Sequence, residues 1–124
     1  MISQGDVYWC DPGQPSGSGP GFLHPFVVVQ NDAFNRSGIN TVVVCGLTSN
    51  LYLAKSPGNV LLDLGEANLP KRSVVNVSQV YTLDKDDLAE KIGTLSPGRV
   101  QEILDGLYRL LEPRDLILPA EDAE

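Results

Sequence analysis

The residues best suited to chemistry in this 124-residue sequence lie around two apolar runs, Phe26–Val29 and Thr41–Cys45. His24, the one histidine of the chain, comes just before the first run, and Thr48 and Ser49 follow the second. An imidazole can take or give a proton near neutral pH, and a hydroxyl can donate a hydrogen bond to developing negative charge. If the two runs are adjacent strands, His24 and Thr48 come to one rim of a sheet.

Composition limits the classes of protein that fit. A length of 124 residues and a hydrophobic content of 42% are typical of one globular domain. The net charge of −7 argues against binding nucleic acid through a general basic surface, so any such binding is expected in a local groove. The absence of a long apolar run and of a signal-peptide pattern predicts a cytoplasmic protein. Cys10 and Cys45 are expected to be buried and unpaired, and too few for a metal site.

The elements that must position His24 and Thr48 are mostly short strands. β-branched and alternating segments predict strands at residues 5–10, 26–30, 41–47, 60–64 and 73–80, with 88–95 starting as a helical turn and finishing as an edge strand. The segment 11–21 is rich in glycine, proline and serine, which predicts a loop. A loop of this length inside a compact domain more often takes part in binding or catalysis than serves only as a connection.

One amphipathic helix ends the fold. Ser96 is a good N-cap and Pro97 suits the first helical position, while leucine and isoleucine recur at helical spacing through Leu111 and Pro113 stops the helix. Strands followed by one helix predict a mainly-β protein with α, namely a small antiparallel sheet or barrel with the helix packed on it. The expected domain is 1–112, and the acidic segment 113–124 is expected to be a flexible tail.

Several segments, in this order and spacing, resemble one known family. They are GDVYW at 5–9, GSGP at 17–20, HPFVVVQNDAFN at 24–35, TVVV and LTSN within 41–50, PGNVLL at 57–62, LPKRSVVNVSQVYTLDK at 69–85 and IGTLS at 92–96. Together they cover most of the chain, from about residue 5 to residue 111. They resemble the MazF/PemK family of toxin endoribonucleases from bacterial toxin–antitoxin systems.

The resemblance implies a small SH3-like (PemK/CcdB-type) antiparallel β-barrel that forms a homodimer. It also implies cleavage of single-stranded RNA at short sequences, with no metal or other cofactor and no membrane. In the family mechanism the ribose 2′-OH attacks the adjacent phosphorus and leaves a 2′,3′-cyclic phosphate and a 5′-OH. The implied protein partner is a cognate MazE-like antitoxin with an acidic, initially disordered tail.

The resemblance places catalytic roles at His24, Thr48 and the position of Leu23. Thr48 matches the family threonine, whose hydroxyl can hydrogen-bond the scissile phosphate; its alternative role is to cap a turn or a strand end. RNA contacts are implied at eight further positions, namely Ser18, Gly19, Arg36, Ser49, Asn50, Lys55, Lys71 and Gln79.

The family arginine is missing from this sequence. It normally stands immediately before the loop proline or one residue earlier, but here those positions are His24 and Leu23. Arginine carries a permanent charge and forked donors, whereas histidine has a reference pKa of about 6.5 and fewer donors. Three alternatives remain open: an enzyme that relies on His24, a toxin weakened by replacement of an arginine at position 23, or help from Arg36.

The competing class is a binding module without nuclease activity. The gyrase-poisoning CcdB proteins resemble this fold and act by binding a protein partner. A barrel whose nuclease site is damaged could likewise bind the antitoxin as a decoy. The end of the expected helix, LLEPRDL, shows no recognisable CcdB-type feature. The Thr48 segment has the nuclease form, which favours the endoribonuclease.

Overall fold

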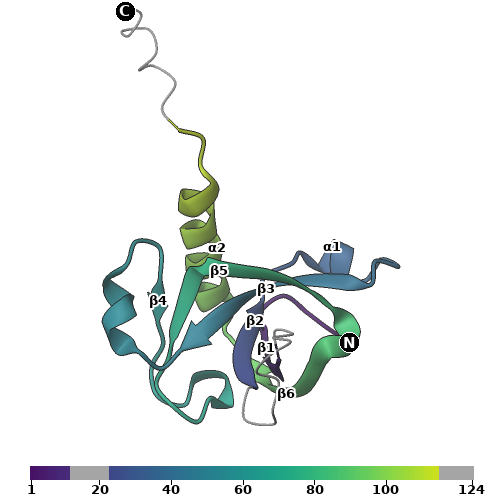
Figure 1. Ribbon diagram of the computed structural model, residues 1–124, viewed down its shortest axis with the longest axis horizontal. Helices are drawn as coiled ribbons and strands as arrows, with labels where there is room; N and C mark the ends of the chain where they lie inside the picture. Colours follow the sequence, from purple (N-terminus) through teal and green to yellow (C-terminus); the bar gives the residue numbers. More distant parts are fainter. Residues whose placement is uncertain (12–22, 115–124) are drawn as a thin grey trace, which may run out of the picture.

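Within the residues that the structure describes, 1–11 and 23–114 of this computed structural model, six strands form one antiparallel sheet (Figure 1). The strands are β1 (Asp6–Cys10), β2 (His24–Val28), β3 (Thr41–Thr48), β4 (Val60–Leu61), β5 (Val74–Asp84) and β6 (Leu88–Thr94). The helices are α1 (Asp32–Asn35) and α2 (Pro97–Leu111), and the 3₁₀ turns are η2 (Leu51–Lys55), η3 (Glu66–Asn68) and η4 (Lys85–Asp87).

The sheet is open at both edges. Its strand order is β4-β5-β3-β2-β1-β6, and no pairing joins β4 to β6 in the described part of the chain. β4 has two residues, and the chain then leaves the sheet through η3, so β6 has no long strand to pair with. The expected class, mainly β with a C-terminal helix, is confirmed, but the sheet does not close into the barrel that the resemblance implied.

Strand boundaries differ from the expected ones where pairing with distant residues decides them. β2 begins at His24, two residues early, because its ladder with β1 extends to the pair Cys10 and His24. β5 continues to Asp84, past the expected end at Val80, because β3 pairs with it along that whole stretch. β4 stops at Leu61 instead of residue 64.

The connections also differ in detail from the expected ones. The helical turn expected at the start of 88–95 lies just before it, as η4, and β6 is extended throughout. β6 is an edge strand, as predicted. The segment after β3 forms the 3₁₀ turn η2.

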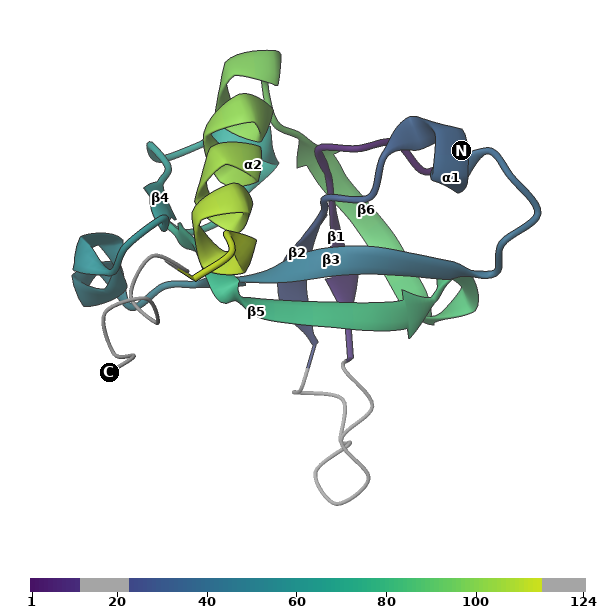
Figure 2. The same cartoon turned by 90° about the horizontal axis from the view of Figure 1, so that it is seen from above.

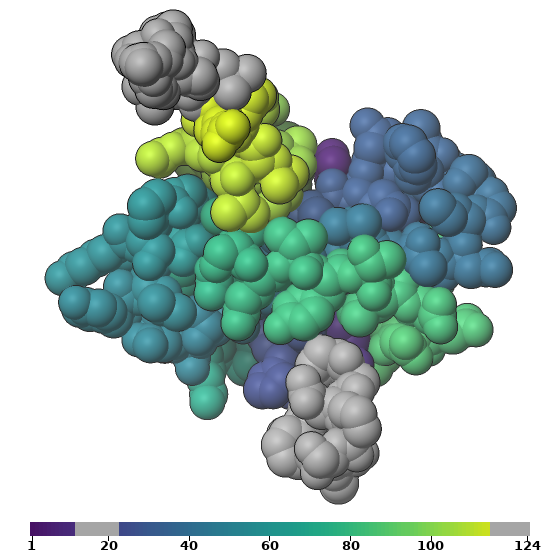
Figure 3. Space-filling model, turned by 45° about the horizontal axis from the view of Figure 1, so that its top comes forward, coloured from purple at the N-terminus to yellow at the C-terminus, as the bar shows by residue number. Residues whose placement is uncertain are grey.

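Alternation along the strands gives the sheet two apolar faces, each with its own core. One core includes Val27 and Val75 and is covered by α2, which contributes the buried Ile103. The other includes Phe26 and Val44. α2 contacts β5 and β4, and it lies over them in both the cartoon and the space-filling view (Figures 2 and 3).

α2 has the predicted bounds. The Ser96 side chain accepts a hydrogen bond from the backbone N–H of Arg99, Pro97 opens the helix, and Leu111 ends it just before Pro113. The expected tail lies outside the described residues apart from 113 and 114. None of the helices in the described residues is long and apolar enough to cross a membrane.

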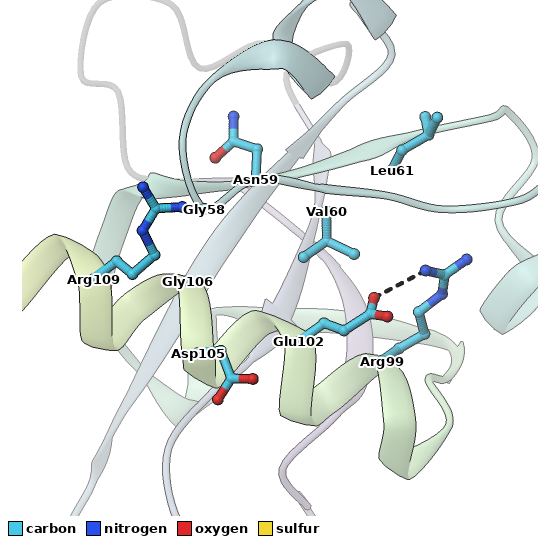
Figure 4. A pocket seen from close by; sticks show the side chains of 9 residues that line it. All are labelled: Gly58, Asn59, Val60, Leu61, Arg99, Glu102, Asp105, Gly106 and Arg109. Atoms are coloured by element: carbon cyan, nitrogen blue, oxygen red, sulfur yellow. Dashed lines mark hydrogen bonds and ion pairs between the residues drawn. The ribbon is translucent and has the colours of Figure 1, made fainter.

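α2 approaches the turn before β4 without an intervening side chain. Gly106 of α2 faces Gly58 of that turn (Figure 4). A Cβ atom on Gly106 would overlap the Gly58 carbonyl oxygen and lie 3.2 Å from its Cα. Glycine is therefore required at position 106 for the helix to pack as it does.

Candidate active site

The ends of β2 and β3 bring His24 and Thr48 together. Phe26 pairs with Gly46 in the antiparallel ladder, and continuing this register by two residues sets His24 opposite Thr48. Both residues line the same two cavities. The predicted meeting of the two strand ends at one rim is confirmed.

The larger of these cavities has a volume of about 400 Å³ and is lined by both apolar and polar residues. β1, β2, the end of β3 and the segment before β5 all contribute to it. Its lining consists of Trp9, Leu23, His24, Pro25, Leu47, Thr48, Ser49, Leu69, Pro70, Lys71 and Ser73. A cavity that combines apolar surface with a few convergent polar groups is typical of a small-ligand site.

The smaller cavity, of about 320 Å³, is walled by aromatic rings and a side-chain amide. Phe26 and Tyr81 meet edge to face with their ring centroids 5.4 Å apart. Gly46 forms part of the lining, and a Cβ atom there would lie 3.0 Å from Oε1 of Gln79. The glycine therefore leaves room for the Gln79 side chain beside His24 and Thr48.

β5 reaches this cavity because it is bulged. Cys45 of β3 pairs with Val80, whereas the next residue, Gly46, pairs with Asn76. Residues 77–79 of β5 lie between these two partners and have no counterpart on β3, so β5 bends there. The bend places Gln79 at the cavity, although Val77, two residues earlier, belongs to the core under α2.

Thr48 and Asn50 have structural roles as well as their predicted ones. The backbone N–H of Asn50 donates a hydrogen bond of 3.1 Å to Oγ1 of Thr48, and the Asn50 side chain accepts one from the N–H of Tyr52 to cap η2. A hydroxyl that accepts one hydrogen bond still has its own proton to donate. Thr48 therefore stabilises the turn after β3 and still has a hydroxyl proton to donate at the rim. Asn50 lines neither cavity.

Of the other residues predicted from the sequence, four lie at the cavities. Leu23, Ser49 and Lys71 line the larger one, and Gln79 lines the smaller one. Leu23 is 44% exposed, so a longer side chain at this position has space. Lys55 instead lies on η2, with its Nζ 4.9 Å from the centre of the Tyr52 ring. Ser18 and Gly19 lie outside the described residues.

Arg36 does not join this group. It follows α1, at the opposite end of β3 from Thr48 (Figure 1), and forms an ion pair of 3.4 Å with Asp32. The pKa of the Asp32 carboxyl is lowered, first by a hydrogen bond from the backbone N–H of Gln4 and then by Asn35 and Arg36. The eight residues of β3 separate Arg36 from the rim, so we leave it out of the candidate site.

The two cysteines are buried and free, as predicted. Burial raises the pKa of both thiols to about 12, and for Cys10 the nearby carboxylates of Asp87 and Asp11 add to this. A thiol is a nucleophile only when ionised, so neither cysteine is suited to covalent catalysis. In the described residues no three side chains of histidine, cysteine, aspartate or glutamate cluster as metal ligands.

Sequence reasoning missed Trp9, Pro70 and Tyr81 as cavity residues. Trp9 pairs with Pro25 in the ladder of β1 and β2, which the alternation within each strand alone does not reveal. Pro70 lies in the segment before β5, and Tyr81 lies on β5 opposite Val44 of β3. Trp9 and Tyr81 are two of the five aromatic residues in the segments that carry the family resemblance, so their type alone did not distinguish them.

The rim can perform acid–base chemistry on a negatively charged ester. His24 supplies a proton acceptor or donor, Thr48 supplies a neutral hydrogen-bond donor, and Lys71 supplies a positive charge. The aromatic and proline surfaces of Trp9 and Pro70 are suited to contact with flat rings such as nucleobases. This combination matches the needs of phosphodiester cleavage.

Comparisons with known proteins agree with this chemistry. A family model described as "PemK-like, MazF-like toxin of type II toxin-antitoxin system" matches residues 3–111. Endoribonuclease MazF6 of Mycobacterium tuberculosis is 42% identical over 112 residues, which cover 90% of this chain and 98% of the relative. Endoribonuclease MazF of Staphylococcus saprophyticus is 37% identical over 103 residues, which cover 83% of this chain and 85% of the relative.

A solved structure of a mycobacterial endoribonuclease in complex with its cognate antitoxin has the same fold. It superposes with a TM-score of 0.73 at 28% identity, and the match covers 93% of this chain and 100% of that one.

Proposed function

Since this chain belongs to the PemK-like, MazF-like family of toxins, we propose that it is an endoribonuclease of the cytoplasm that cuts single-stranded RNA. The observation that carries the proposal is the position of His24 opposite Thr48, at a rim shared by two cavities. The family match and the relatives named endoribonucleases support it. The domain proposed to act is 1–112.

The proposed reaction is an internal transfer of the phosphate. The 2′-oxygen of one ribose forms a bond to the adjacent phosphorus as the bond from phosphorus to the 5′-oxygen breaks. His24 accepts the proton of the 2′-OH, and the leaving 5′-oxygen takes a proton from solvent. The Thr48 hydroxyl donates a hydrogen bond to a non-bridging oxygen, where negative charge increases in the transition state. The products are a 2′,3′-cyclic phosphate and a 5′-OH, and no metal ion takes part.

The two cavities support an RNA substrate of more than one nucleotide. A phosphate held between His24 and Thr48 would adjoin both the 400 Å³ and the 320 Å³ cavity, because both residues line both cavities. Ser49, Lys71 and Gln79 line them with groups that can bind phosphate or base edges. RNA bound in this way runs across the ends of β2 and β3.

The proposed protein partners are a MazE-like antitoxin and a second copy of this chain. The similar mycobacterial structure contains an endoribonuclease with its cognate antitoxin, which supports the first partner. An acidic antitoxin tail lying over the rim would meet Lys71 and cover His24. Toxin activity would then be blocked by occupation of the RNA site.

The second copy is supported by apolar side chains left uncovered on the last turns of α2. Tyr108 is 65% exposed, Leu110 46% and Leu111 74%, and Figure 3 shows this end of α2 on the surface. Light scattering at micromolar concentration should give twice the chain mass of 13.4 kDa, and Leu111→Asp should lower it. A mass of 13.4 kDa for the unaltered protein would contradict the dimer.

The proposed activity is tested by incubating a long RNA of mixed sequence with the protein in EDTA. The unaltered protein should cut it, Thr48→Ala should cut about 10²–10³-fold more slowly, and equimolar antitoxin should stop the reaction. Because Thr48 is at the surface end of β3, a thermal melt of the variant should show an intact fold.

Other outcomes of this test separate the alternatives. Cleavage by a Leu23→Arg variant alone would show that this chain is a disabled form of a nuclease. No cleavage by any variant would overturn the proposed function and favour a protein-binding module.

A further inference from the structure

The rim needs a permanent positive charge that neither His24 nor Thr48 supplies. A phosphodiester carries one negative charge, and its transition state for transfer concentrates more charge on the non-bridging oxygens. The two positions where the resemblance implies an arginine hold Leu23 and His24. If the unaltered chain is active, another of its cations must therefore supply the positive charge that contacts the phosphate oxygens.

Most of the chain's cations lie away from the rim or are paired with other groups. All nine lysines and arginines lie in the described residues, since the segments 12–22 and 115–124 contain none. Four of them are held at other places, because Arg36 pairs with Asp32, Lys91 with Asp6, Arg99 with Glu66, and Lys85 donates to the backbone oxygen of Asn35.

Four more are absent from the linings of the two rim cavities, namely Lys55, Arg72, Arg109 and Arg114. Arg109 is on α2 and lines a separate cavity between α2 and β4 (Figure 4). Lys71 is left, and it lines the larger cavity together with His24 and Thr48. Lys71 is therefore the cation of this chain that lines a rim cavity and is not paired elsewhere in the described structure.

The backbone at Lys71 is anchored while its side chain is not. Leu69 and Ser73, two residues to either side, are buried, and the Ser73 hydroxyl donates a 2.9 Å hydrogen bond to the backbone oxygen of Lys71. The backbone oxygen of Ser73 in turn accepts from the N–H of Leu62 at 2.9 Å. Lys71 itself is exposed, and in the described structure its ammonium forms no ion pair. The charge is therefore placed at the rim and available to a ligand.

We propose that Lys71 is a catalytic residue whose ammonium contacts a non-bridging oxygen of the scissile phosphate, in place of the arginine that the resemblance implies. This inference rests on the proposed endoribonuclease function. In the reaction Lys71 remains protonated throughout, while the 2′-oxygen bonds to phosphorus, the bond to the 5′-oxygen breaks and His24 takes the 2′-proton. Its role is electrostatic, since the ammonium is a compact charge with three donors.

The proposal is tested with four variants in single-turnover cleavage of RNA in EDTA. Lys71→Gln should lower the rate constant at saturating protein by about 10²–10³-fold, as expected when one donor to the developing charge is lost. Lys71→Arg should keep most of the rate because the charge remains. Leu23→Arg should restore cleavage in the Lys71→Gln background, since residue 23 lines the same cavity.

Arg72→Gln is the matched control. It removes one positive charge from the next residue, which is exposed and lines neither cavity, and should leave the rate within about twofold. RNA affinity measured separately should fall only modestly in Lys71→Gln, because one phosphate contact is a small part of binding.

Three results would overturn the role of Lys71. One is a Lys71→Gln rate equal to that of Arg72→Gln, the second is a loss of RNA affinity with an unchanged saturated rate, and the third is cleavage seen only when Leu23→Arg is present. Absence of cleavage by every protein in the series, including the unaltered chain, would overturn the endoribonuclease function itself. The two failures are thus distinguishable.

Discussion

Replacement of His24 by glutamine should slow RNA cleavage by about 10²–10⁴-fold, the usual contribution of a positioned acid–base group. Glutamine keeps a hydrogen-bonding side chain of similar size at the end of β2, but it cannot take the 2′-proton. His24 is exposed and lines both cavities, so its loss should leave the fold intact. The rate of single-turnover cleavage, measured from acid to alkaline pH, checks this expectation.

The pH profile separates acid–base catalysis from simple contact. In the unaltered protein the rate should change with pH because His24 moves a proton, and the chain contains no second histidine to replace it. That dependence should disappear in His24→Gln. Glu90→Gln, an exposed change on β6 that touches neither cavity, serves as the control. A His24→Gln variant within threefold of the control at every pH would rule out the acid–base role.

The largest effect on stability is expected from Gly106→Ala, which should lower the free energy of unfolding by about 3 kcal/mol. Alanine normally favours a helix over glycine by about 1 kcal/mol. Here the added Cβ would overlap the carbonyl oxygen of Gly58 and lie 3.0 Å from its carbonyl carbon. Backbone atoms cannot rotate away as a side chain can, so α2 must shift off the core that includes Ile103. Urea denaturation measures the change.

Gly98→Ala is the matched control in the same helix. A Cβ at position 98 meets nothing within 4 Å, so this change should stabilise the protein by up to about 1 kcal/mol through helix propensity alone. The two substitutions should therefore differ in sign. Equal effects of Gly98→Ala and Gly106→Ala would show that α2 does not pack against the turn at Gly58 as described.

Local signals made part of the fold predictable. Ser96, Pro97 and Pro113 defined the ends of α2 because capping and proline chemistry depend on a few neighbouring residues. The runs around Phe26 and Thr41 predicted strands, and two adjacent antiparallel strands bring the end of one beside the end of the other. The meeting of His24 and Thr48 followed from that argument.

The rest of the candidate site depends on contacts between distant segments. The loop that carries Lys71 arrives beside His24 because β5 pairs with β3, and the position of Gln79 depends on the bulge opposite Gly46. No spacing rule within either segment specifies these pairings. The open sheet has the same origin, since the expected strand 60–64 keeps only two residues in β4.

The type of a residue alone does not show where its side chain lies, and Arg36 is an example. It is a cation in the turn between β2 and β3, and the resemblance implied an RNA contact there. The structure places it at the other end of β3, paired with Asp32. Its separation from Thr48 is set by the eight residues of β3, a length close to that of the predicted strand 41–47.

The central claim is that this rim cleaves RNA through the 2′-hydroxyl, and the ends of the products test it most directly. RNA incubated with the unaltered protein in EDTA should yield fragments that mass spectrometry identifies as ending in a 2′,3′-cyclic phosphate and beginning with a 5′-OH. A 2′-deoxy substitution at the cut position should make that bond resistant. Fragments with 5′-phosphate ends, or equal cleavage of the 2′-deoxy substrate, would contradict the account.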